Sequence, residues 1–532
     1  MPDPDYSVQS NSGSAGQGKS VLGAGKVFLV GAGPGDPRLI TVRGLQCLQM
    51  ADVILYDGLA NLALLEQAPR AEKISVGKHG KDPIWQQSTI NNRLIELASK
   101  GKRVVRLKGG DPAVFARTAE ELTALQEHGI AFEVVPGITA ALAVASYAGI
   151  PLTHRDHASA VALVTAQQQD QPPHDIDWRA LAQFPGTLVV YMGVTTAKQW
   201  TNQLILAGKP ADTPAAIVRR CTWNDQRIIR CPLLEVADHL TPASKLRPPV
   251  LVVIGQAASL GTQWNWFERL PLFGSLVWWP GPVGRSEAVQ EHLMEQGAQV
   301  ISQPVIELQP PNDCGQLQGA LQKLLHRELQ GITFSSRHGV SGFFDYLLSQ
   351  RYDARLLAGV RLAAVGPSVA EQLAGYGLRA DVIPDQQYSA ASLVELLVKQ
   401  VSGQHWLVTT TNRSGDTLER GLLAAGAQVT TCLTYQSVPL QRPGPALVAA
   451  AASGNLRYVL VSSGAIAEGV AKMLSQMPND ATAVVKPIAL GQQTAEALRE
   501  LGLPAVAVSH SNSVRSLIDA LVGYHQVATN KI

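Results

Sequence analysis

Short apolar runs alternate with helical segments from residue 26 onward, and this alternation limits the fold more than any other feature of the sequence. Segments such as TVRGLQCLQMA and TAEELTALQEHG carry apolar residues at helical spacing. Runs that are β-branched and apolar on both faces are typical of parallel strands buried between helices. The sequence therefore predicts an α/β protein, with strands at KVFLVG, DVILYD, KRVVRLKG, AFEVVPG, VALVTA, TLVVYMG, AAIVRR and PPVLVVIG.

A chain of 532 residues is too long for one hydrophobic core. The strand–helix alternation stops near 256–274, GQAASLGTQWNWFERLPLFG, and restarts at SLVWWP. We therefore expect one unit over 26–260, a linker over 261–274 and a second unit over 275–525. Residues 1–25 are rich in Gly and Ser and lack an apolar signal core, so we expect a disordered tail.

The second half contains an internal repeat at a nearly constant offset. The matching pairs are 276–308 with 406–438, 332–344 with 458–470, and 362–378 with 487–503. This order predicts two similar α/β lobes, either in tandem or interleaved. Two alike lobes usually hold a ligand in the cleft between them.

Charge and cysteine content exclude several classes of protein. The net charge is +2 with 16% charged residues, which gives no reason to expect nucleic acid or a membrane surface as partner. The five cysteines are scattered without a CxxC pair, which favours a reducing compartment and argues against a structural metal site. No apolar run is long enough to span a membrane. We expect a cytoplasmic enzyme that holds no metal.

The glycine-rich turn GAGPGD (31–36) follows the first strand directly. It is not a dinucleotide fingerprint, because Asp36 stands where the third glycine belongs and Pro34 lacks the N–H that a pyrophosphate would use. It is not a Walker loop, because no Gly-Lys-Ser/Thr follows. A tight turn without a ligand remains an alternative, although Asp57 ends the next strand where a ribose-binding acid would sit.

A second glycine-rich strand end, RLKGGDPAVF (106–115), favours a ligand. Two such ends can lie side by side at the carboxyl edge of one sheet, where open α/β sheets bind ligands. Neither is a phosphate loop, so the pair fits a cofactor held by backbone groups and apolar contacts. A sulfonium nucleoside has this chemistry.

The motifs GAGPGDPRLIT, ADVILYD, VGK, KRVVRLKGGDP, FEVVPGITAA, YAGIPLTHRD and YMG, in this order, closely resemble uroporphyrinogen-III C-methyltransferases of the tetrapyrrole methylase family. The resemblance covers about 26–260 and implies a two-lobed fold, with lobes at about 26–137 and 138–260. It implies transfer of methyl groups from S-adenosyl-L-methionine to uroporphyrinogen III, giving precorrin-2 for sirohaem or cobalamin synthesis. It also implies a homodimer formed through this half.

This resemblance assigns roles to individual residues. Asp57 matches the family's proposed proton acceptor, and Lys78 matches the proposed proton donor. Without the resemblance, Asp57 would be interpreted as a helix-capping aspartate and Lys78 as a solvated lysine. Gly58 stands where the family usually has an arginine, so Arg155 and Arg117 are this chain's own candidates for binding substrate carboxylates. The cofactor contacts carry over to Pro34, Gly109, Gly110, Asp111, Val114, Thr139, Ala140, Met192 and Cys221, the last at a position where relatives usually have glycine.

The repeated half, 275–525, resembles uroporphyrinogen-III synthases, and WFERLPLFG (266–274) resembles the linker that joins them to such methyltransferases. The resemblance implies lobes at about 275–308 plus 439–525 and at 309–438, and cyclisation of hydroxymethylbilane. Tyr435 matches the family tyrosine that could act as general acid. The hydroxyl positions expected to bind substrate carboxylates are Ser335, Ser336, Ser462, Ser463 and Thr494. Val369 and Trp279 depart from the family's usual threonine and arginine.

Two other interpretations of the second half stay open. It can be a degenerate synthase that only binds tetrapyrrole beside an active methyltransferase. It can also be a pair of sensor lobes, similar to periplasmic binding proteins, without chemistry. Both predict ligand binding without inversion of the last pyrrole ring.

Overall fold

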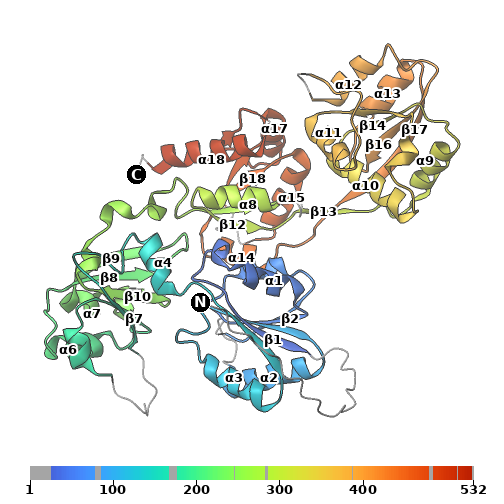
Figure 1. Ribbon diagram of the computed structural model, residues 1–532. Helices are drawn as coiled ribbons and strands as arrows, with labels where there is room; N and C mark the ends of the chain where they lie inside the picture. The colour runs from blue at the N-terminus through green and yellow to red at the C-terminus, as the bar shows by residue number, and fades with distance from the viewer. Residues whose placement is uncertain are drawn as a thin grey trace, which may run out of the picture. The chain divides into compact units, whose positions relative to one another are not determined.

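The computed structural model describes residues 25–77, 85–166, 176–244, 246–281, 286–385, 388–477, 483–511 and 513–529. The tail predicted over 1–25 therefore lies outside the described residues, apart from Gly25. The chain divides into two compact units, Met1–Gly274 and Ser275–Ile532. Each unit contains two five-stranded sheets with helices packed against them, so the predicted α/β class is confirmed (Figure 1). No described helix combines the length and apolar character needed to cross a membrane.

The first lobe of unit 1 is a parallel sheet in the order β3-β2-β4-β1-β5. Its strands are β1 (Lys26–Gly31), β2 (Val53–Tyr56), β3 (Glu72–Ser75), β4 (Arg103–Lys108) and β5 (Ala131–Val135). Its helices are α1 (Val42–Met50), α2 (Gln87–Ser99) and α3 (Thr118–Glu127). Figure 1 shows α1 on one face of this sheet and α2 and α3 on the other.

Both faces of this first sheet are buried because successive side chains of β1 point to opposite sides. Phe28 and Val30 pack with Leu48 of α1 in one core. Val27 and Leu29 pack with Leu94 of α2 in the other core. This two-sided burial explains why the strands are continuous apolar runs.

The second lobe of unit 1 has the sheet order β6-β7-β10-β8-β9. Its strands are β6 (Val161–Thr165), β7 (Thr187–Tyr191), β8 (Pro214–Arg219), β9 (Arg227–Pro232) and β10 (Val250–Ile254), and its helices are α4 (Ala140–Tyr147), α5 (Trp178–Gln183), α6 (Ala197–Leu206) and α7 (Val236–His239). Only β6 and β7 pair in parallel, whereas β7–β10, β10–β8 and β8–β9 are antiparallel. The prediction that all strands are parallel is wrong here. Cores on both faces bury these strands, so burial alone does not reveal their direction.

Unit 2 contains a parallel sheet in the order β12-β11-β18-β19-β20. Its strands are β11 (Leu276–Trp279), β12 (Gln299–Ser302), β18 (Leu456–Val461), β19 (Lys486–Ala489) and β20 (Ala507–Val508). Its helices are α8 (Ser286–Glu295), α14 (Pro445–Ala452), α15 (Gly464–Leu474), α17 (Gln492–Glu500) and α18 (Val514–Thr529).

The other sheet of unit 2 has the order β13-β17-β16-β14-β15, parallel except for the antiparallel pair β13–β17. Its strands are β13 (Ile306–Gln309), β14 (Gly331–Phe334), β15 (Arg361–Ala364), β16 (His405–Thr411) and β17 (Gln428–Pro439). Its helices are α9 (Gly315–Leu325), α10 (Arg337–Ser349), α11 (Pro367–Ala374), α12 (Ala390–Leu397) and α13 (Thr417–Ala424).

The sequence repeat corresponds to a repeat in three dimensions. The order β12-β11-β18-β19 in one sheet matches β17-β16-β14-β15 in the other. The chain builds β11 and β12, crosses to build the whole of the second sheet, and returns to complete the first. The two similar lobes are therefore interleaved in sequence, which is one of the two arrangements that the repeat left open.

Candidate functional site

The two glycine-rich strand ends lie next to each other at the carboxyl edge of the first sheet. The N–H of Gly110 donates to the carbonyl of Gly33 at 2.8 Å, and the N–H of Gly33 donates to the carbonyl of Gly110 at 3.2 Å. Both glycines have positive φ, +76° at Gly33 and +69° at Gly110. The prediction that these two motifs meet is confirmed.

Glycine is required at this edge mainly because loops approach one another closely. A Cβ on Gly31 would lie 2.6 Å from the Cα of Gly137, and one on Gly109 would lie 2.7 Å from the Cβ of Leu59. A Cβ on Gly110 would have only the Cα of Thr139 nearby, at 3.9 Å. Packing therefore explains Gly31 and Gly109, whereas an added Cβ on Gly110 would make only an ordinary contact.

Asp57 lies at the end of β2, beside this glycine pair. Its carboxylate accepts the N–H of Gly109 at 3.2 and 3.3 Å and the N–H of Leu59 at 3.2 Å. The Nη2 atom of Arg106 lies 3.9 Å from its Oδ2, and 26% of the side chain is exposed. Asp57 is thus a fixed, ionisable and solvent-accessible group at the sheet edge.

A buried ion cluster lies behind Asp57. Glu121 of α3 is fully buried and accepts from Lys108 Nζ at 2.6 Å and from Arg106 Nε at 3.1 Å. Burial lowers the pKa of Lys108. Sequence reasoning missed this cluster; the signal for its cations was the pair Arg106 and Lys108 of RVVRLK, which are two residues apart and so lie on one face of β4.

Tyr191 at the end of β7 joins segments that sequence reasoning assigned separately. Its hydroxyl lies 2.8 Å from Thr139 Oγ1 and accepts the N–H of Ala141 at 2.9 Å. Its ring lies 5.0 Å from that of Phe115, in the loop that follows Asp111. Burial raises the pKa of Tyr191, so this hydroxyl stays protonated. Neither aromatic residue was predicted as part of the site.

Met192 follows Tyr191 and is not part of the core. Its φ is +52° and 44% of the residue is exposed. Tyr191 therefore brings Thr139 and Ala140, at the start of α4, together with Met192. The Asp111 side chain fixes its own loop, since it accepts the N–H groups of Ala113 at 2.7 Å and Gly137 at 2.9 Å; Val114 follows in that loop and is half-buried.

Cys221 lies in the turn between β8 and β9, and its side chain points into the hydrophobic core. It is 7% exposed, and burial raises the pKa of its thiol far above the usual value. The preceding Arg220 and the following Thr222 both have positive φ. Thr222 Oγ1 accepts the N–H of Asp36 at 2.9 Å, which places this turn against the loop that contains the half-buried Pro34. Any contact of Cys221 with a ligand would therefore use its backbone.

The charged candidates are less constrained. Arg117 pairs with Glu120, with two contacts of 2.7 Å. Arg155 is exposed in the segment after α4. Lys78 lies outside the described residues. Among the described residues, no three His, Cys, Asp or Glu side chains lie close enough to hold a metal ion.

In unit 2, the predicted serines lie at two equivalent helix starts. Ser336 caps α10 by accepting the N–H of Gly339, and Ser463 caps α15 by accepting the N–H of Ile466. Ser335 and Ser462 precede them directly. Strand β14 leads into Ser335 and β18 into Ser462, so both pairs lie at carboxyl ends of matching strands.

Tyr435 lies on β17 beside the first of these helix starts. Its hydroxyl is 3.2 Å from Ser336 Oγ, and its ring is 5.9 Å from that of His338, which the sequence did not point to. In the other lobe, Thr494 of α17 is 5% exposed. Its counterpart in the repeat is Val369 of α11, which is also 5% exposed and lies in the same lobe as Tyr435. The site residues thus form two groups, one in each lobe.

Comparisons with known proteins agree with both halves. Residues 26–237 match the family model of tetrapyrrole (corrin/porphyrin) methylases, and residues 287–519 match that of uroporphyrinogen-III synthase HemD. The porphyrin biosynthesis protein HemD of Ruminiclostridium josui is 34% identical over 94% of this chain and 98% of its own. The uroporphyrinogen-III C-methyltransferase of Bacillus subtilis is 39% identical over 69% of this chain and 75% of its own.

Other relatives match the first half only. The siroheme synthase of Chromobacterium violaceum is 48% identical over 46% of this chain and 52% of its own, so the chain spans about half of that relative's length. The solved structure of uroporphyrin-III C-methyl transferase from Thermus thermophilus, complexed with S-adenyl homocysteine, is 39% identical over 44% of this chain and 98% of its own, with a TM-score of 0.38. The long matches to the Ruminiclostridium and Bacillus proteins show the family: the chain belongs to the tetrapyrrole methylases through its first half and to the uroporphyrinogen-III synthases through its second, and so joins a transferase and a lyase family in one polypeptide.

Proposed function

We propose that this chain is a bifunctional enzyme of tetrapyrrole synthesis for sirohaem or cobalamin. Its second half cyclises hydroxymethylbilane to uroporphyrinogen III. Its first half transfers methyl groups from S-adenosyl-L-methionine to two ring carbons of that product, giving precorrin-2. The observation that carries the methyltransferase proposal is the accessible Asp57 carboxylate, fixed beside the Gly33–Gly110 pair.

The groups at this edge fit a sulfonium nucleoside. An added Cβ on Gly110 would have no atom closer than 3.9 Å, Met192 is exposed, and backbone groups at Thr139 and Ala140 lie at the start of a helix. Such groups can enclose an adenosine and a thioether without binding phosphates. S-adenosyl-L-methionine, when bound there, supplies an electrophilic methyl group. The same contacts are proposed for Pro34, Gly109, Asp111, Val114 and the backbone of Cys221.

The chain's own part in methyl transfer is positioning and proton transfer. Methylation of a substituted pyrrole carbon, which carries no hydrogen, leaves the macrocycle positively charged until it loses a proton from another atom, and Asp57 is the proposed acceptor of that proton. Its two hydrogen-bond donors hold the carboxylate in place while leaving part of it accessible. Lys78 is the proposed donor. Arg155 and, on release from Glu120, Arg117 would bind substrate carboxylates.

In the second half, Tyr435 is the proposed general acid. Its hydroxyl, 3.2 Å from Ser336 Oγ, would protonate the leaving hydroxyl of the bilane, which departs as water. Ser335, Ser462, Ser463 and Thr494 would bind carboxylates of the substrate with hydroxyl and helix-start N–H groups. The buried Val369, at the position that matches Thr494, favours the alternative of a half that only binds tetrapyrrole.

The test is an anaerobic incubation of the full chain with hydroxymethylbilane and S-adenosyl-L-methionine, followed by mass and isomer analysis. A dimethylated type-III product supports both activities. Asp57→Asn should lower methylation about 10²–10⁴-fold and leave cyclisation intact, whereas Tyr435→Phe should do the reverse. Methylation only of ready-made uroporphyrinogen III would reduce the second half to binding, and no methylation of either substrate would refute the methyltransferase proposal.

We also propose that the first half forms a homodimer. The exposed Leu142 and Leu163, among other residues, line an apolar groove of about 490 Å³ in its second lobe. An exposed apolar groove of this kind supports the proposal that a second copy of the chain covers it. Sedimentation equilibrium of the chain should give twice the monomer mass of 56.7 kDa. A monomer at micromolar concentration would contradict this proposal.

A further inference from the structure

The segment between the two predicted domains packs against the end of α4. The ring of Tyr147 lies 5.1 Å from that of Trp266 and 4.9 Å from that of Phe267. Trp266 Nε1 donates to the carbonyl of Ser146 at 2.9 Å, and Phe267 is 4% exposed. These contacts make 262–273 a packed part of unit 1 rather than a free connection.

Tyr147 connects this segment to the first lobe. Its hydroxyl donates to Asp36 Oδ2 at 3.0 Å. Asp36 is 4% exposed, and its carboxylate is also held by Arg38 Nη2 at 2.7 Å. Burial and the charge of Asp36 raise the pKa of Tyr147, so the hydroxyl remains a donor across the physiological range.

A closed ring of hydrogen bonds passes between the two lobes. The carbonyl of Tyr147 accepts from Gln226 Nε2 at 3.3 Å, and Gln226 Oε1 accepts the N–H of Thr222 at 3.0 Å. Thr222 Oγ1 accepts the N–H of Asp36 at 2.9 Å, and Asp36 accepts from Tyr147. Each member of the ring is thus held by two others.

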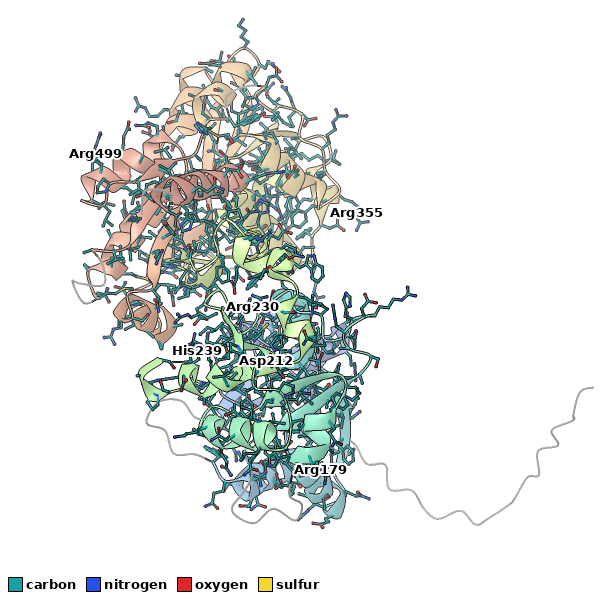
Figure 2. All side chains as sticks on the ribbon, turned by 90° about the vertical axis from the view of Figure 1, so that its left-hand side faces the viewer. Arg179, Asp212, Arg230, His239, Arg355 and Arg499 are labelled. Atoms are coloured by element: carbon teal, nitrogen blue, oxygen red, sulfur yellow. The ribbon has the colours of Figure 1, made fainter. Side chains whose placement is uncertain are left out.

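Glu268 attaches the connecting segment to the same ring. Its Oε1 accepts from Gln226 Nε2 at 3.1 Å, and its Oε2 accepts from Asn265 Nδ2 at 2.8 Å. Its charge also acts on Arg230 of β9, labelled in Figure 2, whose pKa burial lowers. The segment therefore touches the ring through both Tyr147 and Gln226.

The ring joins the two loops that are proposed to hold the cofactor from opposite lobes. Asp36 follows Pro34 by two residues, and Thr222 follows Cys221 directly. We infer that residues 262–273 are a positioning element of the methyltransferase. Through Tyr147 and Gln226 this element fixes the 33–36 loop against the 220–223 turn, and it thereby sets the affinity for S-adenosyl-L-methionine. The inference rests on the proposed function of this site.

The test is titration of the full-length chain with S-adenosylhomocysteine by calorimetry. Tyr147→Phe keeps the ring stack and removes the hydrogen bond to Asp36, a charged partner. We expect the dissociation constant and the KM for S-adenosyl-L-methionine to rise about tenfold. kcat at saturating cofactor and the KM for uroporphyrinogen III should stay within twofold. Tyr352→Phe, at a partly exposed tyrosine of unit 2, is the matched control.

A second variant and a second measurement separate the possible failures. Glu268→Ala lies outside the proposed cofactor contacts and should raise the dissociation constant about threefold. It replaces Tyr147→Phe as the test if that variant proves unstable. Hydrogen exchange of segments 33–38 and 220–226 should be faster in both variants, with or without cofactor. If the wild type binds S-adenosylhomocysteine and the variants bind it with the same affinity, the inference is refuted and the proposed function stands. A wild type that binds no S-adenosylhomocysteine would refute the proposed function, and unchanged exchange would then refute the coupling as well.

Discussion

Replacing Glu121 with glutamine tests the buried ion cluster behind Asp57. Glu121 is fully buried and is the anion shared by Arg106 and Lys108, which are 5% and 2% exposed. Glutamine keeps the volume and can still accept one hydrogen bond, but the two buried cations lose their shared charge. Their nearest remaining anion is Asp57, 3.9 Å from Arg106 Nη2.

The expected cost follows from this geometry. Removing one partner of a buried ion pair costs about 3–5 kcal/mol, because it leaves the other charge buried and uncompensated. Two cations lose the same partner here, so we expect Glu121→Gln to lower the free energy of unfolding of unit 1 by that amount. Burial already lowers the pKa of Lys108. The unfolded state binds more protons in the pH range below the usual lysine pKa, so the stability of the variant should rise with pH there.

The assay is urea unfolding of the full chain, with protection of β4 amides from hydrogen exchange as the probe of unit 1. The matched control is the neighbouring Glu120→Gln, because Glu120 is exposed and pairs with the exposed Arg117. An exposed pair is worth about 0.2–1 kcal/mol. If Glu121→Gln cost no more than Glu120→Gln, the argument from buried charge would be refuted.

Two further predictions concern unit 1. Gly109→Ala places a Cβ 2.7 Å from that of Leu59, so we expect about 1–3 kcal/mol of destabilisation in urea unfolding. The control is Gly319→Ala in helix α9, where no atom lies within 4 Å of the new Cβ, and it should be neutral or stabilising. Equal effects of the two substitutions would contradict the packing argument. Hydrogen bonds from two basic side chains, foremost Arg43, lower the pKa of Glu133 to about 2. The carboxylate therefore stabilises the fold above about pH 4.5 and this contribution is lost toward pH 2, so Glu133→Gln should flatten the acid side of the stability profile measured by thermal unfolding; an unchanged profile would contradict the pairing.

The sequence predicts the strands of this fold better than their directions. Apolar runs mark β1, β4, β7 and β10 correctly because these strands are buried on both faces. The edge strand β3, EKIS, is polar and partly exposed, so periodicity did not reveal it. The prediction included β8, as AAIVRR, but not the partly exposed β9. The antiparallel direction of strands in this lobe was also missed, because direction depends on the connection between strands and not on their burial.

The candidate site divides in the same way. Asp57 and Gly110 could be predicted because local motifs at strand ends carry them. Tyr191, Glu121 and Phe115 could not, because each acts through contacts with distant segments. A motif reports backbone geometry along the chain, whereas these three residues are defined by what the fold brings beside them.

The prediction of parallel strands in the second lobe is wrong, but this error does not change where the predicted site residues lie. The sheet order explains why. Strand β10 pairs antiparallel with both β7 and β8, so β7 and β8 run in the same direction on either side of it. Their carboxyl ends therefore lie at one edge of the sheet, and the residues that follow these ends include Met192 and Cys221. Reversing β10 leaves this edge unchanged. The antiparallel return of β9 then makes 220–226 a tight turn, and this turn is what allows Thr222 to reach Asp36 of the other lobe.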